Sequence, residues 1–262
     1  LHIATGLIEP HFMAGYSGGR KAIFPGICAF ESVKVLHGPA PMSHERAVEC
    51  NLEGNPVHAE ALHVAKAARV DFILNVTLNE RRQITGVFAG DLDEAHREGV
   101  AFMASQCKSE VDAPVDAVIT SAAGFPLDLT FYQTVKGMTA AAGILRAGGV
   151  VVIASKCAEG IGSPEFTNLI LGAGSIDRFL EDIRKPGVYT LDQWQLQKLA
   201  SVVTKHEVWL YSDGIPKETQ KSLFVTPLGS MNEAVSRILE RFGHDARIAV
   251  IPEGPYVYAA VK

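Results

Sequence analysis

Apolar and polar positions follow different patterns in the two parts of the chain. Up to residue 110, short apolar segments are interrupted by glycine and proline, which predicts strands and helices of mixed order. Arg20 opens a short helix that Pro25-Gly26 ends. The other expected elements are strands 1–8, 71–77 and 83–89, the last two as a hairpin, and helices 29–36, 56–69 and 91–107.

From residue 111 onward, short apolar strands alternate with helical patterns. The expected elements are strands 116–121, 149–155, 207–211 and 247–251, and helices 129–145, 164–171, 176–183, 191–203 and 230–242. Such alternation is typical of a parallel sheet covered by helices on both faces. Ligands of these sheets bind beyond the carboxyl ends of the strands.

The polar segment 108–114 is the best candidate for a linker. We therefore predict the α/β class, with a partial cofactor-binding α/β domain at 1–110 followed by a parallel-sheet α/β domain at 111–262. The chain starts at Leu1 in what resembles the middle of a strand, so we expect an upstream segment to be missing.

Composition narrows the function classes. The 262 residues are 47% hydrophobic and 20% charged, as in an ordinary soluble globular protein. A net charge of -5 without a long basic block argues against nucleic acid as the main partner. No apolar segment has the length of a membrane span. The four cysteines form no CxxC pair, which argues against a disulfide framework and favours a reducing, cytoplasmic compartment.

The first candidate site is the glycine-rich segment Gly15–Lys21, flanked by His11 and His37. Glycines let a backbone approach an anion closely, and a lysine after them can bind phosphate or act as a nucleophile. Imidazoles serve as bases or as ligands for zinc, copper and nickel. The spacing fits neither GxxxxGK[ST] nor GxGxxG. A structural turn, a solvated lysine and two hydrogen-bonded histidines therefore remain the alternative interpretation.

A second candidate site follows the strand at 116–121. The helix there carries Tyr132, Gln133 and Lys136, and the last two are three residues apart on one helix face. An amide beside an ammonium suits a carboxylate or a hydroxy acid, although an exposed polar helix face is the alternative. The segment 156–162 follows the next strand and could line the same crevice. Its Cys157 has no base placed beside it by spacing.

The remaining histidines of the first part carry no prediction of chemistry. His44, His58 and His63 are expected on the surface. His58 and His63 are five residues apart, which is not the spacing of a ligand pair on one helix face.

Taken together, these motifs resemble the nickel-pincer lactate racemase family. The resemblance rests first on His11, Ser17-Gly18-Gly19, Lys21 and His37, whose spacing is fairly specific. It continues over essentially the whole chain, through Asn55-Pro56, Ala122–Pro126, Tyr132-Gln133-x-x-Lys136 and Cys157–Gly162, with Trp194 as a looser match.

The resemblance implies a racemase or epimerase of lactate-like 2-hydroxy acids that transfers hydride to and from a nickel-pincer nucleotide. That cofactor is pyridinium-3,5-bisthiocarboxylic acid mononucleotide nickel, made by separate cofactor-synthesis enzymes. It implies these roles: a covalent bond to Lys21, cofactor binding by Ser17, Gly18 and Gly19, nickel ligation by His37, acid–base catalysis by His11, and substrate binding by Gln133 and Lys136. Residues 1–110 would be the carboxyl-terminal half of the catalytic domain, and 111–262 would close over the substrate site.

Family members carry a further histidine and a substrate-binding arginine in an upstream segment that this sequence lacks. We therefore expect a truncated, inactive form. Two alternatives remain open from the residues alone. One is a phosphate- or nucleotide-binding module without catalysis. The other is a Schiff-base enzyme that uses Lys21 with a carbonyl cofactor such as pyridoxal phosphate.

Overall fold

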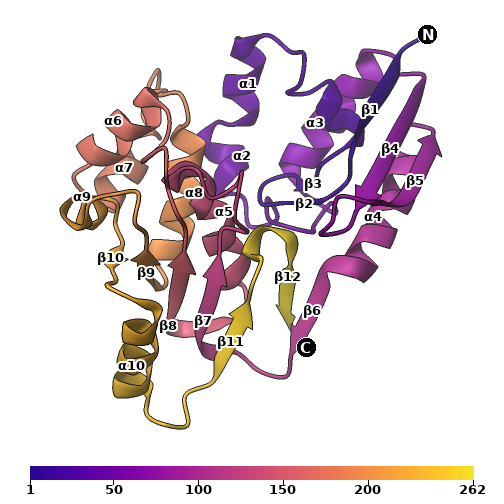
Figure 1. Ribbon diagram of the computed structural model, residues 1–262. Helices are drawn as coiled ribbons and strands as arrows, with labels where there is room; N and C mark the ends of the chain where they lie inside the picture. The colour runs from indigo at the N-terminus through magenta and orange to yellow at the C-terminus, as the bar shows by residue number, and fades with distance from the viewer. The chain divides into compact units, whose positions relative to one another are not determined.

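The computed structural model describes residues 1–262 and divides into two compact units, Leu1–Lys108 and Ser109–Lys262 (Figure 1). No helix in it combines the length and the apolar character needed to cross a membrane. All four cysteines are free thiols.

The first unit is built on a three-stranded sheet of order β1 (Ile3–Leu7), β4 (Phe72–Leu78) and β5 (Ile84–Gly90). β1 and β4 are parallel, whereas β4 and β5 form the expected antiparallel hairpin. Successive side chains point to opposite faces of a strand, so one face of this sheet is buried and the other is exposed. The buried face packs on α3 and α4 through Ala4, Ala65, Ile73, Leu92 and Ala95. The exposed face carries Ile3, Phe72, Leu74, Ile84 and Val87.

Around this sheet lie the short strands β2 (Pro10–His11) and β3 (Gly15–Tyr16), the 3-10 turn η1 (Gly19–Ala22), and the helices α1 (Phe30–Leu36), α2 (Pro39–Ser43), α3 (Pro56–Ala67) and α4 (Glu94–Cys107). Local sequence explains where the two long helices begin. Asn55 accepts hydrogen bonds from the first amides of α3, and a proline occupies the first position of that helix. Asp91 accepts from the amides of Asp93 and Glu94 at the start of α4.

The second unit contains a five-stranded parallel sheet of order β10-β9-β8-β7-β11. Its strands are β7 (Val115–Ser121), β8 (Leu145–Ala154), β9 (Glu207–Tyr211), β10 (Thr226–Pro227) and β11 (Ile248–Ile251). Its helices are α5 (Phe131–Ala142), α6 (Pro164–Gly172), α7 (Ile176–Asp182), α8 (Gln193–Val203), α9 (Lys217–Lys221) and α10 (Met231–Phe242), with the 3-10 turn η2 at Gly254–Tyr256.

Strand β8 shows why helices cover both faces of this sheet. Val151 and Ile153 belong to an apolar cluster that includes buried residues of α5, α6 and α8. Val150 and Val152 alternate with them and belong to a second cluster with residues of α10. An all-apolar central strand is therefore buried on both sides, as its sequence predicts. The α/β class and the parallel sheet are confirmed.

Three details of the sequence prediction are wrong. Segment 108–114 is not a linker throughout, because Lys108–Val111 forms strand β6, which pairs with β12 (Tyr258–Val261). Its charged, exposed side chains are those of a solvated strand edge, which looks like a linker in sequence. Strand 247–251 is consequently not the last one. The helix expected at 129–145 ends at Ala142, because Leu145 already begins β8.

Candidate functional site

His11 lies at the start of the glycine-rich segment, in the small antiparallel pair in which it faces Gly15. Its Nδ1 accepts hydrogen bonds from the amides of Met13 (3.2 Å) and Ala14 (3.1 Å). A neutral imidazole that accepts at Nδ1 carries its proton on Nε2. The local backbone therefore selects one tautomer of His11 and presents Nε2–H as a donor.

The loop that follows is held by its own hydrogen bonds. The Ser17 hydroxyl donates to the Leu7 carbonyl at 2.6 Å and accepts from the Glu9 amide at 3.0 Å. The Ser17 amide donates to the Glu9 carbonyl, and the Lys21 amide donates to the Gly18 carbonyl. These amides are occupied within the protein, so they do not form the open row of N–H groups that a phosphate cradle requires.

Gly18 and Gly19 are required by close packing. Both have positive φ, at 77° and 50°. A Cβ on Gly18 would lie 2.6 Å from Asn75 Oδ1, and a Cβ on Gly19 would lie 2.8 Å from the ring of His96. The Gly19 amide also donates to Asn75 Oδ1 at 2.6 Å. The two glycines thus let the loop lie directly on side chains of β4 and α4.

Lys21 and His37 are carried by two different elements of the first unit. Lys21 is half-buried in η1, and His37 follows α1 with 8% of its surface exposed. Both elements contact α3. The Nδ1 of His37 lies 3.0 Å from the Val33 carbonyl, so this nitrogen carries the proton and donates. The lone pair is then on Nε2, the arrangement common in metal-ligating histidines.

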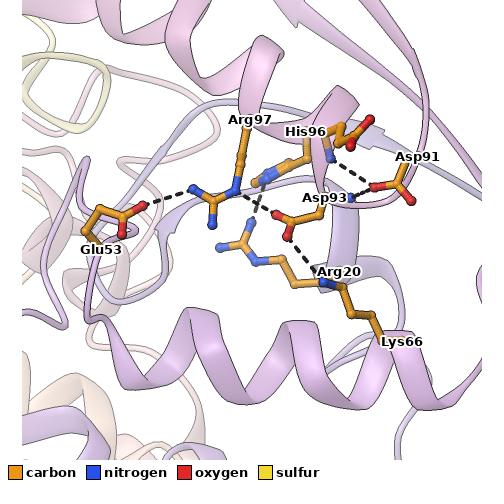
Figure 2. A network of polar contacts seen from close by, with 8 residues as sticks. Arg20, Glu53, Lys66, Asp91, Asp93, His96 and Arg97 are labelled. Atoms are coloured by element: carbon orange, nitrogen blue, oxygen red, sulfur yellow. Dashed lines mark hydrogen bonds and ion pairs between the residues drawn. The ribbon is translucent and has the colours of Figure 1, made fainter.

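Three buried residues near this loop were not predicted as partners: Arg20, His58 and His96. Figure 2 shows Arg20 beside His96, within a network of ion pairs that includes Asp93 and Arg97. Burial, with the nearby Arg20 cation, lowers the pKa of His58 to about 3 and that of His96 to about 4. Burial lowers the pKa of Arg20 to about 9, so its guanidinium is still cationic at neutral pH.

The surface position expected for His58 is wrong. His58 is 4% exposed because it shares the inward face of α3 with Ala61 and Ala65, and its ring stacks on that of His96 with centroids 6.5 Å apart. The small alanines leave room for the ring. The spacing of these three residues was the available signal, since they follow the helical repeat and the exposed His63 does not.

The second unit has a pocket of about 500 Å³ beside its parallel sheet. The lining comes from segments that follow β7 and β8, and from the start of α8: Thr130, Tyr132, Gln133, Glu159, Gly162, Ser163 and Asp192. This is the end of the sheet at which α/β proteins bind ligands. The expectation that segment 156–162 lines the same crevice as Gln133 is confirmed through Glu159 and Gly162.

A chain of hydrogen bonds forms one side of this pocket. Trp194 Nε1 donates to the Tyr132 hydroxyl at 3.0 Å, which donates to Asp192 at 3.4 Å. Ser163 donates to the other carboxylate oxygen of Asp192 at 2.6 Å. Burial and the Asp192 charge raise the pKa of the Tyr132 phenol. The amide oxygen of Gln133 is buried with no partner in the protein, so it is an acceptor that a bound ligand could satisfy.

Lys136 and Cys157 are the other residues of the second unit that the sequence singled out. Lys136 is half-buried on α5, one turn after Gln133. Cys157 is fully buried, with its thiol 3.4 Å from the Ser155 hydroxyl and 3.6 Å from that of Thr134. A buried thiol among neutral hydroxyls is structural.

Comparison with known proteins identifies the family. The lactate racemase C-terminal domain matches residues 110–258, and the lactate racemase N-terminal domain matches residues 1–49. The chain belongs to the lactate racemase family. The lactate racemase of Thermoanaerobacterium thermosaccharolyticum is 38% identical over 100% of this chain, and that of Lactiplantibacillus plantarum is 33% identical over 97%. The chain spans 62% and 60% of the lengths of these two relatives.

Two solved structures resemble this chain in fold. The lactate racemase apoprotein from T. thermosaccharolyticum superposes with a TM-score of 0.93 at 37% identity, over 98% of this chain and 62% of that one. A Thermotoga maritima protein superposes with a TM-score of 0.69 at 18% identity, over 99% of this chain and 66% of that one. The second likeness concerns the fold alone.

Proposed function

We propose that the protein to which this sequence belongs acts in the racemisation or epimerisation of a short 2-hydroxy acid such as lactate. The first unit would carry a nickel-pincer nucleotide on Lys21, and the second unit would bind the substrate. The proposal rests on one observation. Lys21 follows the glycines of the loop in a chain that belongs to the lactate racemase family.

The residues of the first unit fit such a cofactor. His37 donates from Nδ1 to the Val33 carbonyl and so has its lone pair on Nε2, as a nickel ligand needs. No group of three or more histidine, cysteine or acidic side chains could hold a metal ion by itself. A metal at His37 would therefore take its other ligands from the cofactor. When bound, the cofactor supplies an electron-poor carbon beside nickel that can accept the substrate's hydrogen with its electron pair and return it.

His11 would exchange the proton of the substrate hydroxyl. In the resting structure its Nδ1 accepts from two amides, so the neutral ring presents Nε2–H as a hydrogen-bond donor to a substrate oxygen. To take the hydroxyl proton at Nε2, His11 must first adopt the other tautomer, with its proton on Nδ1, which requires the amides of Met13 and Ala14 to move away. The imidazolium formed in this way can then return the proton to the substrate oxygen.

Ser17, Gly18 and Gly19 would contribute through the shape of the loop. Their hydroxyl, φ angles and close packing fix the path that leads to Lys21. The amine of Lys21, which is half-buried, would form the covalent bond.

Gln133 and Lys136 would bind the substrate carboxylate or its carbonyl oxygen. Gln133 lines the pocket: its unpartnered Oε1 can accept from the substrate hydroxyl, and its NH2 group can donate to a carboxylate or carbonyl oxygen. The ammonium of Lys136 lies one helical turn further along α5. An amide and an ammonium match a carboxylate beside a hydroxyl. Tyr132, held by its hydrogen bonds with Trp194 and Asp192, would fix one side of the pocket.

The test is to co-express the chain with cofactor-synthesis enzymes and measure nickel and substrate binding. We expect about one nickel per chain, lost in His37→Ala but kept in the exposed-histidine control His63→Ala. We also expect Gln133→Ala and Lys136→Ala to weaken binding of a 2-hydroxy acid at least tenfold, about 1.4 kcal/mol, by calorimetry. Equal nickel content in His37→Ala would contradict the proposed ligand. Inversion of one lactate enantiomer, followed by chiral chromatography, then tests the reaction.

A further inference from the structure

The side chain of Arg20 makes an unusual set of contacts. It is 1% exposed and no carboxylate forms an ion pair with it. Its Nη2 donates to the Ala14 carbonyl at 2.7 Å, and its Nη1 lies 2.9 Å from His96 Nε2. Its Nε has no partner. The charge of Asp93 acts on this guanidinium without pairing with it. A buried cation with no paired carboxylate costs stability, and replacement by an apolar side chain of similar volume is often neutral or stabilising.

The contact between Arg20 and His96 defines the state of the histidine. A guanidinium can only donate, so His96 Nε2 accepts from it and the ring is neutral with its proton on Nδ1. The same Nε2 is 2.9 Å from the Ser17 carbonyl, to which it does not donate while it accepts from Arg20, and the His96 ring packs on Gly19. Arg20 therefore holds the loop through the Ala14 carbonyl, and His96 supports it by fixing Arg20 and by packing on Gly19.

The second support of the loop comes from β4. Asn75 is fully buried, and its Oδ1 accepts from the Gly19 amide. Lys21 directly follows Arg20 in the same 3-10 turn, where consecutive side chains point about 120° apart. Because the Arg20 side chain is fixed in the interior, the direction in which the turn presents Lys21 is fixed as well.

We propose that Arg20 and His96 are positioning residues that set the orientation of Lys21, with Asn75 as the support of the turn. The inference rests on the proposed function in one respect, namely that the position of Lys21 matters because this lysine carries the cofactor. The fork of an arginine is suited to this task, because it reaches two acceptors in different directions, whereas a lysine reaches one.

The experiment uses the complete chain without cofactor and compares Arg20→Met, Arg20→Lys, His96→Leu and His96→Gln. Hydrogen exchange reports the amides of residues 14–21. Acylation by an amine reagent, followed by peptide mass spectrometry, reports the reactivity of Lys21 relative to Lys185 of the second unit. Arg97→Met is the matched control, because it removes a cation next to His96 that contacts Glu53 and Asp93 but not the loop.

We expect Arg20→Met and His96→Leu to raise loop exchange at least tenfold and to change the relative acylation of Lys21 at least threefold. His96→Gln, whose amide oxygen can still accept from Arg20, should stay within twofold of the parent. Arg97→Met should also stay within twofold. A parent-like loop in both Arg20→Met and His96→Leu, or an equal effect of His96→Gln and His96→Leu, would overturn the proposal.

If Arg20→Met does not fold, the variant Arg20→Lys is used to test the proposal instead. It keeps the charge and should show an intermediate increase in exchange; unchanged exchange and acylation in Arg20→Lys would overturn the proposal. The readouts need no cofactor. A failure here therefore leaves the assignment of Lys21 as cofactor carrier intact, and a failure of that assignment leaves this result intact.

Discussion

In the first unit, Asn75 and His96 lie buried against the glycine-rich segment Gly15–Lys21, His58 stacks on His96, and Arg20 of the segment itself is buried, whereas the helices that carry the pocket of the second unit rest on an apolar cluster. In the first unit, buried polar groups contact the loop directly. In the second, most pocket residues lie at the starts of α5, α6 and α8, which contribute residues to the apolar cluster, although α8 also buries Gln193, Gln195, Gln197 and Lys198. A single change beneath the loop should therefore alter its geometry, while a change in the pocket should leave the fold intact.

Gly19→Ala should give the largest effect. Alanine at position 19 would have to adopt the positive φ of this glycine, and its Cβ would lie 2.8 Å from the His96 ring. We expect a loss of about 2–4 kcal/mol in the free energy of unfolding, measured by urea titration. Gly172→Ala is the control, because its Cβ would contact nothing. A parent-like stability of Gly19→Ala would show that the loop does not rest tightly on α4.

Acid should destabilise the first unit through His58 and His96. Their folded pKa values are about 3 and about 4, below the ordinary 6.5. Below pH 6.5 the unfolded chain takes up protons that the folded chain does not, so stability falls as the pH decreases toward 4, by about 1 kcal/mol per pH unit for each histidine.

The measurement is the difference in unfolding free energy between parent and His58→Leu at pH 7 and pH 5. We expect the variant to lose less stability than the parent over this interval. His63→Leu, exposed on the same helix, is the control and should follow the parent. An identical loss in parent and His58→Leu would mean that burial does not suppress the protonation of His58.

Tyr132→Phe should have a smaller effect. It removes the hydroxyl that accepts from Trp194 and donates to Asp192, which leaves the indole N–H without this partner. We expect a cost of about 1–2 kcal/mol, with the circular dichroism spectrum unchanged. Tyr211→Phe, on strand β9, should cost less. A loss of fold in Tyr132→Phe would contradict the view that the fold of the second unit does not depend on this hydroxyl.

Arg97→Met should have the smallest effect on stability. Arg97 pairs with Asp93 and Glu53, but its side chain is 47% exposed (Figure 2). Exposed pairs contribute about 0–1 kcal/mol and are screened by salt. We expect a change of this size at low salt and none at high salt. A loss comparable to that of Gly19→Ala would show that the exposed ion pairs of Arg97 contribute more to the stability of the first unit than the buried contact between Arg20 and His96 does.

The sequence was sufficient for the parts of the molecule that follow local rules. The apolar run in β8 predicted a strand buried on both faces, and Asn55-Pro56 predicted the start of α3. The motif spacing singled out His11, Lys21 and His37 as candidates, and their roles remain proposals. Strand β6 was missed because a charged edge strand has the composition of a linker.

The polar support of the loop could not be predicted in the same way. Arg20 and His96 are separated by 76 positions, and their contact arises only when α4 packs beside the loop. Asn75 lies in the mostly apolar strand β4, whose sequence gives no sign of the partner of this side chain. Such contacts depend on tertiary packing, which periodicity in one chain does not encode.

The most direct test of the account is the mass of Lys21 in chains co-expressed with the cofactor-synthesis enzymes. Peptide mass spectrometry should find a nucleotide-sized adduct on the peptide that contains Lys21, and Lys21→Arg should abolish it. Unmodified Lys21 in the presence of cofactor that modifies a lactate racemase expressed alongside, or an adduct on a different lysine, would contradict the account.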